Sequence, residues 1–122
     1  MKKITFLSTL LCFFVCSEET DTTLNAYAAG YVANFTCSAT FNAGKSKDQI
    51  DTDELTGIYP LIADTVKTLK ANIDTEHKRV IVDYDKDKQR ISVWRPRLGC
   101  VDLPVGASLK AATLVQAPFK EN

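Results

Sequence analysis

Two cysteines that lie far apart in the chain, Cys37 and Cys100, constrain the fold more than any other feature. They are the only cysteines outside an N-terminal hydrophobic stretch. In an exported protein both would meet an oxidising compartment, where an intramolecular disulfide is the default state of such a pair. Closing a loop of about 60 residues stabilises a fold by roughly 4 kcal/mol in the chain-entropy model. Two buried free thiols are the alternative, and no neighbouring His or Cys residues complete a metal site.

An export signal at the N-terminus supports the disulfide. Two lysines precede about a dozen mostly apolar residues, which is fewer than the roughly 20 that a membrane-spanning helix needs. We therefore predict a signal peptide over residues 1–17, with a cleavage site as late as residue 28 as the alternative. The mature chain is expected in the periplasm or outside the cell, with no stable membrane span after signal removal. Attachment of a lipid to Cys16 and retention of the signal as an uncleaved anchor are further alternatives.

Composition limits the chain to one domain and disfavours two classes of partner. The 122 residues include 15 basic and 15 acidic side chains, so the formal net charge is zero. Binding of nucleic acid needs a clustered basic excess, and strong attraction to an anionic membrane needs basic segments. We therefore expect no nucleic-acid partner.

Apolar spacing predicts helices in the first half of the chain. The polar stretch that follows the signal, over residues 18–28, is expected to be flexible. Residues 24–38 show the i, i+3, i+4, i+7 stripe of an amphipathic helix. A capping-box pattern starts a short helix predicted over 46–55. Pro60 is expected to interrupt any helix through the apolar cluster around it.

The second half changes to the period of two that is typical of strands with one covered face. Three short runs, near residues 69–73, 80–84 and 91–94, alternate apolar and polar side chains, and polar turn segments separate them. We predict an α+β fold in which N-terminal helices pack on one face of a three-stranded antiparallel meander, with one disulfide. The domain is expected to cover residues 29–106, and residues 107–122 are interpreted as a connector or tail without a core element.

No catalytic motif accompanies this predicted fold. None of the serines of the mature chain starts a Ser-x-x-Lys motif, and no Gly-x-Ser-x-Gly motif occurs. His77, the only histidine, falls in a predicted hairpin turn without a nucleophile nearby, so we interpret it as a solvated turn residue. Asp83, Asp85 and Asp87 lack the glycine and the glutamate of a calcium-binding loop. We therefore predict no catalytic residue, no metal site and no cofactor.

The end of the third predicted strand offers one candidate binding site. Trp94, Arg95 and Arg97 form an anion-binding candidate, because guanidinium groups hold anions with pairs of parallel hydrogen bonds. The simpler interpretation, which we favour, is a strand end whose arginines pair with local carboxylates or carbonyls.

Several short segments occur in an order that resembles a known family. They are Ala-Gly-Tyr-Val-Ala (29–33), Cys-Ser-Ala-Thr-Phe (37–41), Gly-Lys (44–45), Asp-Glu-Leu (53–55) and Val-Trp-Arg-Pro-Arg-Leu-Gly-Cys (93–100). Together with the predicted hairpin over 71–82, they resemble the N-terminal extension of bacterial serine hydrolases related to class C β-lactamases and penicillin-binding proteins. The likeness covers roughly residues 29–106. Trp94 stands where tyrosine is usual in that family, and Lys45 stands where arginine is common.

The resemblance implies a structural role. In that family the nucleophilic Ser-x-x-Lys lies downstream of the extension, so no catalytic residue is carried over. What carries over is the Cys37–Cys100 bridge and an α+β piece that leans on the catalytic domain. We therefore expect a non-catalytic N-terminal fragment of a secreted serine hydrolase, whose partner is the missing downstream hydrolase domain. The alternatives are a free-standing exported binding module that uses the Trp94, Arg95 and Arg97 face, and a structural module of the cell envelope.

Overall fold

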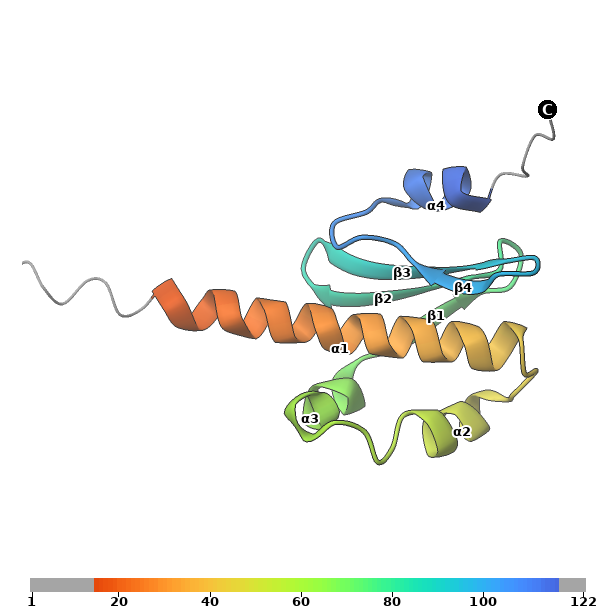
Figure 1. Cartoon of the computed structure of the whole chain (residues 1–122). Helices are drawn as coiled ribbons and strands as arrows, with labels where there is room; N and C mark the ends of the chain where they lie inside the picture. The colour runs from red at the N-terminus through yellow and green to blue at the C-terminus, as the bar shows by residue number, and fades with distance from the viewer. Residues whose placement is uncertain (1–14, 117–122) are drawn as a thin grey trace, which may run out of the picture.

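The chain folds as an α+β domain in which a long helix lies along an antiparallel sheet (Figure 1). The computed structural model describes the backbone of residues 15–116 and the side chains of residues 21–116. The elements are α1 (Val15–Phe41), α2 (Lys47–Gln49), the π-helical turn η1 (Ile50–Glu54), α3 (Pro60–Thr68), β1 (Ala71–Asp74), β2 (Arg79–Asp85), β3 (Lys88–Arg95), β4 (Gly99–Asp102) and α4 (Leu109–Gln116). The predicted α+β class is confirmed.

The predicted signal peptide falls mostly outside the described residues. Residues 1–14 and the side chains of residues 15–20, which include Cys16, are not described. Signal cleavage and lipid attachment therefore stay predictions. Within the described part of the chain, no helix combines the length and the apolar character that crossing a bilayer requires.

The sheet is a meander of four antiparallel strands in the order β1-β2-β3-β4. Ala71 of β1 lies opposite Val82 of β2, and Trp94 of β3 lies opposite Cys100 of β4. The three strands predicted from alternation are β1, β2 and β3, so the predicted strand number was wrong by one. β4 holds only four residues, over which alternation gives no distinct signal, and pairing with β3 rather than its own pattern makes it a strand.

α1 is longer than the helix predicted over 24–38. It includes residues 18–28, which were expected to be flexible and are helical. That expectation was wrong because residues 15–29 contain neither glycine nor proline, and polarity alone does not end a helix. On its covered side α1 buries mostly small residues, which lets its backbone lie close to the sheet. These small residues are Ala26, Ala28, Ala29, Gly30, Ala33, Cys37 and Ala39.

Between α1 and the sheet, the chain forms an arm of short helices, α2, η1 and α3. The predicted capping box begins α2: the Gln49 N–H donates to Ser46 Oγ at 3.4 Å, and the Ser46 N–H donates to Gln49 Oε1 at 2.9 Å. Pro60 was expected to interrupt a helix, but it begins α3 instead. At the first helical position the missing N–H of proline leaves no hydrogen bond unmade.

Helices cover both faces of the sheet, which corrects the prediction of helices on one face only (Figure 1). α1 and α3 pack on one face. α4 packs on the other, where Ala112 is buried with Ile91 and Leu103. The tail expected over 107–122 therefore contains a core element within its described part. Its sequence signal was weak because alanines, rather than large apolar residues, form most of the covered side of α4.

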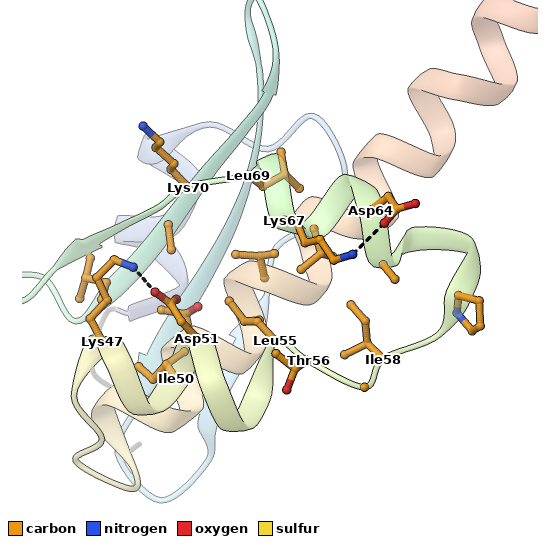
Figure 2. Close-up of a pocket in the computed structure, with 18 residues that line it drawn as sticks. Lys47, Ile50, Asp51, Leu55, Thr56, Ile58, Asp64, Lys67, Leu69 and Lys70 are labelled. Carbon is orange, nitrogen blue, oxygen red and sulfur yellow. Dashed lines mark hydrogen bonds and ion pairs between the residues drawn. The ribbon is translucent and has the colours of Figure 1, made fainter.

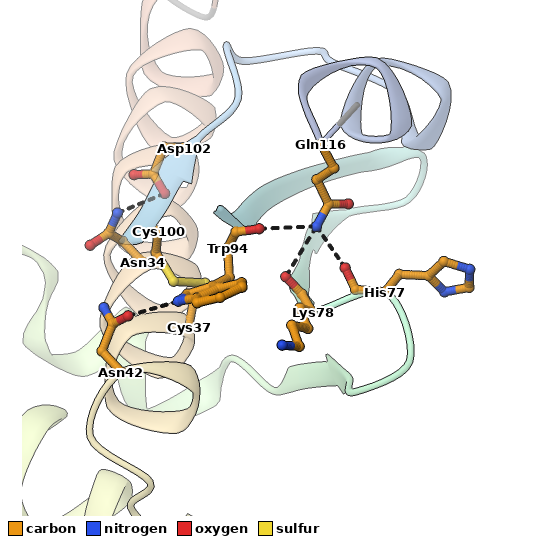
Figure 3. Close-up of a disulfide and its surroundings, with 9 residues drawn as sticks. All are labelled: Asn34, Cys37, Asn42, His77, Lys78, Trp94, Cys100, Asp102 and Gln116. Atoms are coloured by element: carbon orange, nitrogen blue, oxygen red, sulfur yellow. Dashed lines mark hydrogen bonds between the residues drawn. A yellow bond between two sulfur atoms is a disulfide. The ribbon is translucent and has the colours of Figure 1, made fainter. Parts of the chain in front are cut away.

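The predicted disulfide joins α1 to β4. Cys37 and Cys100 are bonded, with their Cα atoms 6.0 Å apart. A second link lies one turn away, where Asn34 Nδ2 donates to Asp102 Oδ1 at 3.0 Å (Figure 3). Cys100 and Asp102 are two positions apart in one strand, so both side chains point to the face that α1 covers. The long helix is thus fixed to the last strand by a covalent and a polar contact.

Candidate functional site

A pocket opens between the arm of short helices and the first strand of the sheet (Figure 2). Its volume is about 1020 Å³, which is near the upper end for small-ligand sites. We call it the edge pocket, because β1 lies at the edge of the sheet. It is defined by Val32 and Thr36 of α1, Ile50, Leu55 and Ile58 of the arm, Ala63 and Val66 of α3, and Leu69, Ala71 and Ile73 at β1.

The interior of the edge pocket is apolar because each wall turns its hydrophobic side inwards. Val32 of α1 and Val66 of α3 belong to the main core, and the pocket extends this core towards the surface. On the sheet side, Leu69, Ala71 and Ile73 occupy alternate positions, so they share one face of β1. The same period of two that predicted β1 therefore explains why this wall is continuous.

Polar contacts hold η1, the outer wall of the pocket, against α1. Lys45 Nζ lies 2.6 Å from Glu54 Oε1 and 3.2 Å from Asp53 Oδ2. The Tyr31 hydroxyl donates to the backbone oxygen of Glu54 at 3.1 Å. The hydrogen bonds that Lys45 donates to Glu54 and then to Asp53 raise the pKa of Lys45, while burial and then the Glu54 charge raise the pKa of Tyr31. These contacts position η1, and with it Ile50, over the pocket.

Charged side chains surround the opening, and most of them are already paired. Lys47 pairs with Asp51 one turn along, and Lys67 Nζ lies 2.9 Å from Asp64 Oδ1 (Figure 2). The hydrogen bond that Lys47 donates to Asp51 raises the pKa of Lys47, and the hydrogen bond that Asp64 accepts from Lys67 lowers the pKa of Asp64. Lys70 differs from them, because no carboxylate of the described residues lies within ion-pair distance of it. Lys70 is therefore the basic group of the rim that can pair with a charged ligand.

One polar group of the pocket lining is buried. The Thr36 side chain is 2% exposed, and its hydroxyl has no hydrogen-bond partner among the described residues. A buried hydroxyl without a partner is unfavourable by roughly 1–3 kcal/mol. The described lining contains no serine, cysteine or histidine, and most of its inner surface is apolar.

His77 lies in the β1–β2 turn, as predicted, and is not part of the edge pocket. Asp74 Oδ1 accepts a hydrogen bond from the His77 backbone N–H at 3.0 Å, and Asp74 Oδ2 lies 2.9 Å from His77 Nδ1 and from Arg79 Nε. The backbone bond from His77, and then the His77 and Arg79 side chains, lower the pKa of Asp74. This cluster closes a turn, and its histidine side chain is 54% exposed.

The anion-binding candidate spans the end of β3 and the β3–β4 turn. Trp94 points towards α1 beside the disulfide, and its indole N–H donates to Asn42 Oδ1 at 2.8 Å (Figure 3). Arg95 is the next residue of the same strand, so its side chain leaves from the opposite face. Arg97 is exposed in the β3–β4 turn, where its φ is +66°. The side chains of Trp94 and Arg95 therefore lie on opposite faces of the sheet.

A different cation lies on Trp94. The Lys78 ammonium is 4.3 Å from the centre of the indole ring, within the range of a cation–π contact. Gln116, at the end of α4, donates through Nε2 to the backbone oxygens of His77 at 2.6 Å and Trp94 at 3.2 Å (Figure 3). Neither contact was predicted from the sequence. The hairpin register that places Lys78 beside Trp94 was the only signal that could have shown the first.

Within the part of the chain whose side chains are described, no three His, Cys, Asp or Glu residues gather as a metal site would require. No family model, no curated protein and no solved structure matches the chain. The likeness to β-lactamase-related hydrolases therefore stays a prediction, and the edge pocket is the feature of the fold that best fits a function.

Proposed function

We propose that this chain is a non-catalytic, exported binding domain. It would act as an accessory domain of a serine hydrolase of the β-lactamase-related type. The observation that carries the proposal is the edge pocket, which is large, apolar and bordered by charges that mostly satisfy one another. Such a site holds apolar groups through shape and the hydrophobic effect. Its described lining holds no serine, cysteine or histidine, the residues that most often carry acyl transfer.

The ordered motifs around Cys37 and Cys100 support a hydrolase as the protein that this domain serves. A second surface agrees with that role. Large apolar side chains stay exposed along the segment from the β3–β4 turn to α4, and such exposure is typical of interaction surfaces. These residues are Leu98, Val101, Val105, Leu109 and Leu114. A catalytic domain packed on this segment would cover them.

Two kinds of probe test the proposal on the purified, oxidised chain. A fluorophosphonate ester and a fluorescent penicillin should leave it unlabelled, whereas an anilinonaphthalene sulfonate dye should bind one site. Ala63→Trp fills the edge pocket and should abolish dye binding. Leu61→Trp, on the exposed side of the same helix, is the matched control and should not. Stoichiometric labelling, or dye binding that ignores Ala63→Trp, would contradict the proposal.

A free-standing binding module of the cell envelope is the second candidate. It is favoured by the fact that four elements of this chain form the edge pocket without help from another domain. Sedimentation velocity separates the two candidates. An accessory domain should self-associate at high concentration through its exposed apolar segment, and Leu109→Lys with Leu114→Lys should make it monomeric. A free-standing module should be monomeric from the start.

A further inference from the structure

β1 is an edge strand whose outer side is unpaired in the described chain. It pairs with β2 on one side, and no other described strand or loop forms a backbone hydrogen bond with it. In a strand paired on one side, the N–H and C=O groups of alternate residues point away from the partner strand. Such an edge is a template for another extended chain.

The edge pocket lies under that open edge. Ala71 and Ile73 point to the face that α1 covers, because their register partners Val82 and Val80 are buried there. Both residues also line the pocket, so its cavity extends beside β1 on this same face. A strand laid along β1 would therefore send every second side chain into the edge pocket. Backbone bonds and a pocket for alternate side chains are the two components of peptide recognition by strand addition.

The residues between these positions indicate which side chains an added strand would carry at its other positions. Lys70, which precedes β1 at the rim of the edge pocket, and Asn72 of β1 alternate along the chain with Leu69, Ala71 and Ile73, and both are exposed. Lys70 has no carboxylate partner among the described residues. On a neighbouring strand, an acidic side chain opposite or diagonal to Lys70 would form a favourable cross-strand pair.

From this arrangement we propose that the edge pocket and β1 together bind an extended segment of a partner protein, in which apolar residues alternate with acidic ones. The apolar side chains enter the pocket, the acidic ones lie beside Lys70, and the backbone extends the sheet by one strand. This inference rests on the proposed binding role and names the class of partner that the site takes. A free fatty acid, which also combines an apolar chain with an anion, is the competing occupant.

The first test uses a blocked, fluorescein-labelled heptapeptide of alternating valine and glutamate, measured by fluorescence anisotropy. Two derivatives carry N-methyl groups, one on the valine amides and one on the glutamate amides. Only one edge of an added strand bonds to β1, so one derivative should lose at least about tenfold in affinity through its missing hydrogen bonds, while the other binds as the parent does. Equal loss in both, or in neither, would overturn strand addition.

Protein variants then test the two faces separately. Ala63→Trp should abolish peptide binding, and Leu61→Trp should leave it unchanged. Lys70→Glu should weaken the glutamate peptide by several-fold, as expected for one exposed ion pair, and strengthen a peptide with lysine in place of glutamate. This charge exchange does not depend on the pocket variant folding well. Lack of any charge preference at position 70 would count against the assignment.

The failure of this inference differs from the failure of the proposed function. If the dye occupies the edge pocket but neither peptide binds, the site binds something other than a strand, and the inference alone falls. If laurate displaces the dye at concentrations where the peptide does not, the fatty acid replaces the peptide as occupant. If dye, peptide and laurate all fail to bind, the proposed binding role falls as well.

Discussion

The two faces of the sheet are held by different means. On one face, α1 and α3 surround a cluster of nine buried residues, and the disulfide ties α1 to β4. On the other face, the eight-residue α4 covers a cluster of four. Because the free energy of local opening follows the buried contacts that must be broken, the α4 face should open alone, whereas the α1 face should open only with the whole domain.

Polar contacts compensate in part for the thin cover of the α4 face. Gln116 ties the end of α4 to the β1–β2 turn and to the end of β3 through three backbone oxygens. An amide group has two N–H donors, so these three oxygens share them. The attachment of α4 therefore depends on the geometry of the β1–β2 turn, whereas the attachment of α1 depends on packing and a covalent bond.

Matching substitutions in the two helices give the largest expected contrast. Ala33 of α1 and Ala112 of α4 are both fully buried. Ala33→Asp should destabilise the domain by more than about 4 kcal/mol, because a buried unpaired charge cannot be relieved without unfolding. Ala112→Asp should be limited to about 1–2 kcal/mol, because α4 can detach and expose the charge to water. Urea denaturation measures both free energies of unfolding.

Hydrogen exchange tests whether detachment of α4 explains the smaller loss of stability in Ala112→Asp. In Ala112→Asp the amides of α4 should exchange rapidly while those of α1 keep their protection. Ala111→Asp, on a half-buried position of the same helix, is the control and should have a smaller effect. Equal losses of stability in Ala33→Asp and Ala112→Asp would mean that the two faces unfold as one unit.

Removal of the disulfide should be the next largest effect. Replacing Cys37 and Cys100 by alanine frees a loop with a sequence separation of 63 residues, and the chain-entropy model predicts a loss of about 4 kcal/mol or somewhat less. Because α1 opens only with the whole domain, its amides should then lose protection and exchange at rates closer to those of α4. A reductant should produce the same change in the parent chain and none in the double variant. A double variant as stable as the parent would show that packing alone holds α1.

Much of the α1 face could be predicted from the sequence, and much of the α4 face could not. The central part of α1, the strands β1 to β3 and the bond between Cys37 and Cys100 follow from apolar spacing and from the pairing expected of two cysteines behind a predicted export signal. β4 and α4 are short, and pairing or docking with distant residues stabilises them. Patterns over four to eight residues carry too little information to reveal such elements.

The edge pocket was hidden from sequence reasoning for a related reason. Its lining comes from four elements, and no motif shows that residues 32–36, 50–58 and 69–73 meet in space. Trp94, Arg95 and Arg97 show the converse case, because they are close in sequence. Adjacent strand residues point to opposite faces, so proximity along a strand separates side chains rather than gathering them.

Acid should weaken the α4 face before the α1 face, with an effect smaller than loss of the disulfide. Asp74 has a pKa below its ordinary value of 3.8 because the backbone N–H of His77, then the His77 and Arg79 side chains, bond to it. The unfolded chain therefore takes up a proton first, so the stability that Asp74 contributes is present above about pH 4 and is lost as pH falls through the lowered pKa. Loss of this cluster loosens the turn to which Gln116 is bonded.

Urea denaturation at a series of acidic pH values measures this contribution. Asp74→Asn should flatten the pH dependence and release α4 amides to exchange already at neutral pH. Asp64→Asn removes another carboxylate whose pKa is lowered, but it lies on α3, so it should leave α4 protected. If both variants affected α4 alike, the turn would not be its anchor.

The smallest effect is expected where α1 lies closest to the sheet. A Cβ atom on Gly30 would come within 3.0 Å of the Arg90 guanidinium, whose Nη1 donates to the backbone oxygen of Ala26 at 3.2 Å. Alanine in a helix interior is favoured over glycine by about 1 kcal/mol. Displacing the tip of Arg90 weakens one hydrogen bond of similar value. The two terms oppose each other, so Gly30→Ala should change the free energy of unfolding by less than about 1 kcal/mol.

A double-mutant cycle separates the two terms. In an Arg90→Ala background nothing opposes the new methyl group, and Gly30→Ala should stabilise the domain by about 1 kcal/mol. The difference between the two backgrounds measures how tightly α1 lies against β3. A large loss of stability in both backgrounds would mean that the strand backbone, rather than a flexible side chain, blocks position 30. The close packing of α1 on the sheet, which its small residues allow, would then tolerate no added atom at this position. The contrast between the α1 face and the α4 face would be greater.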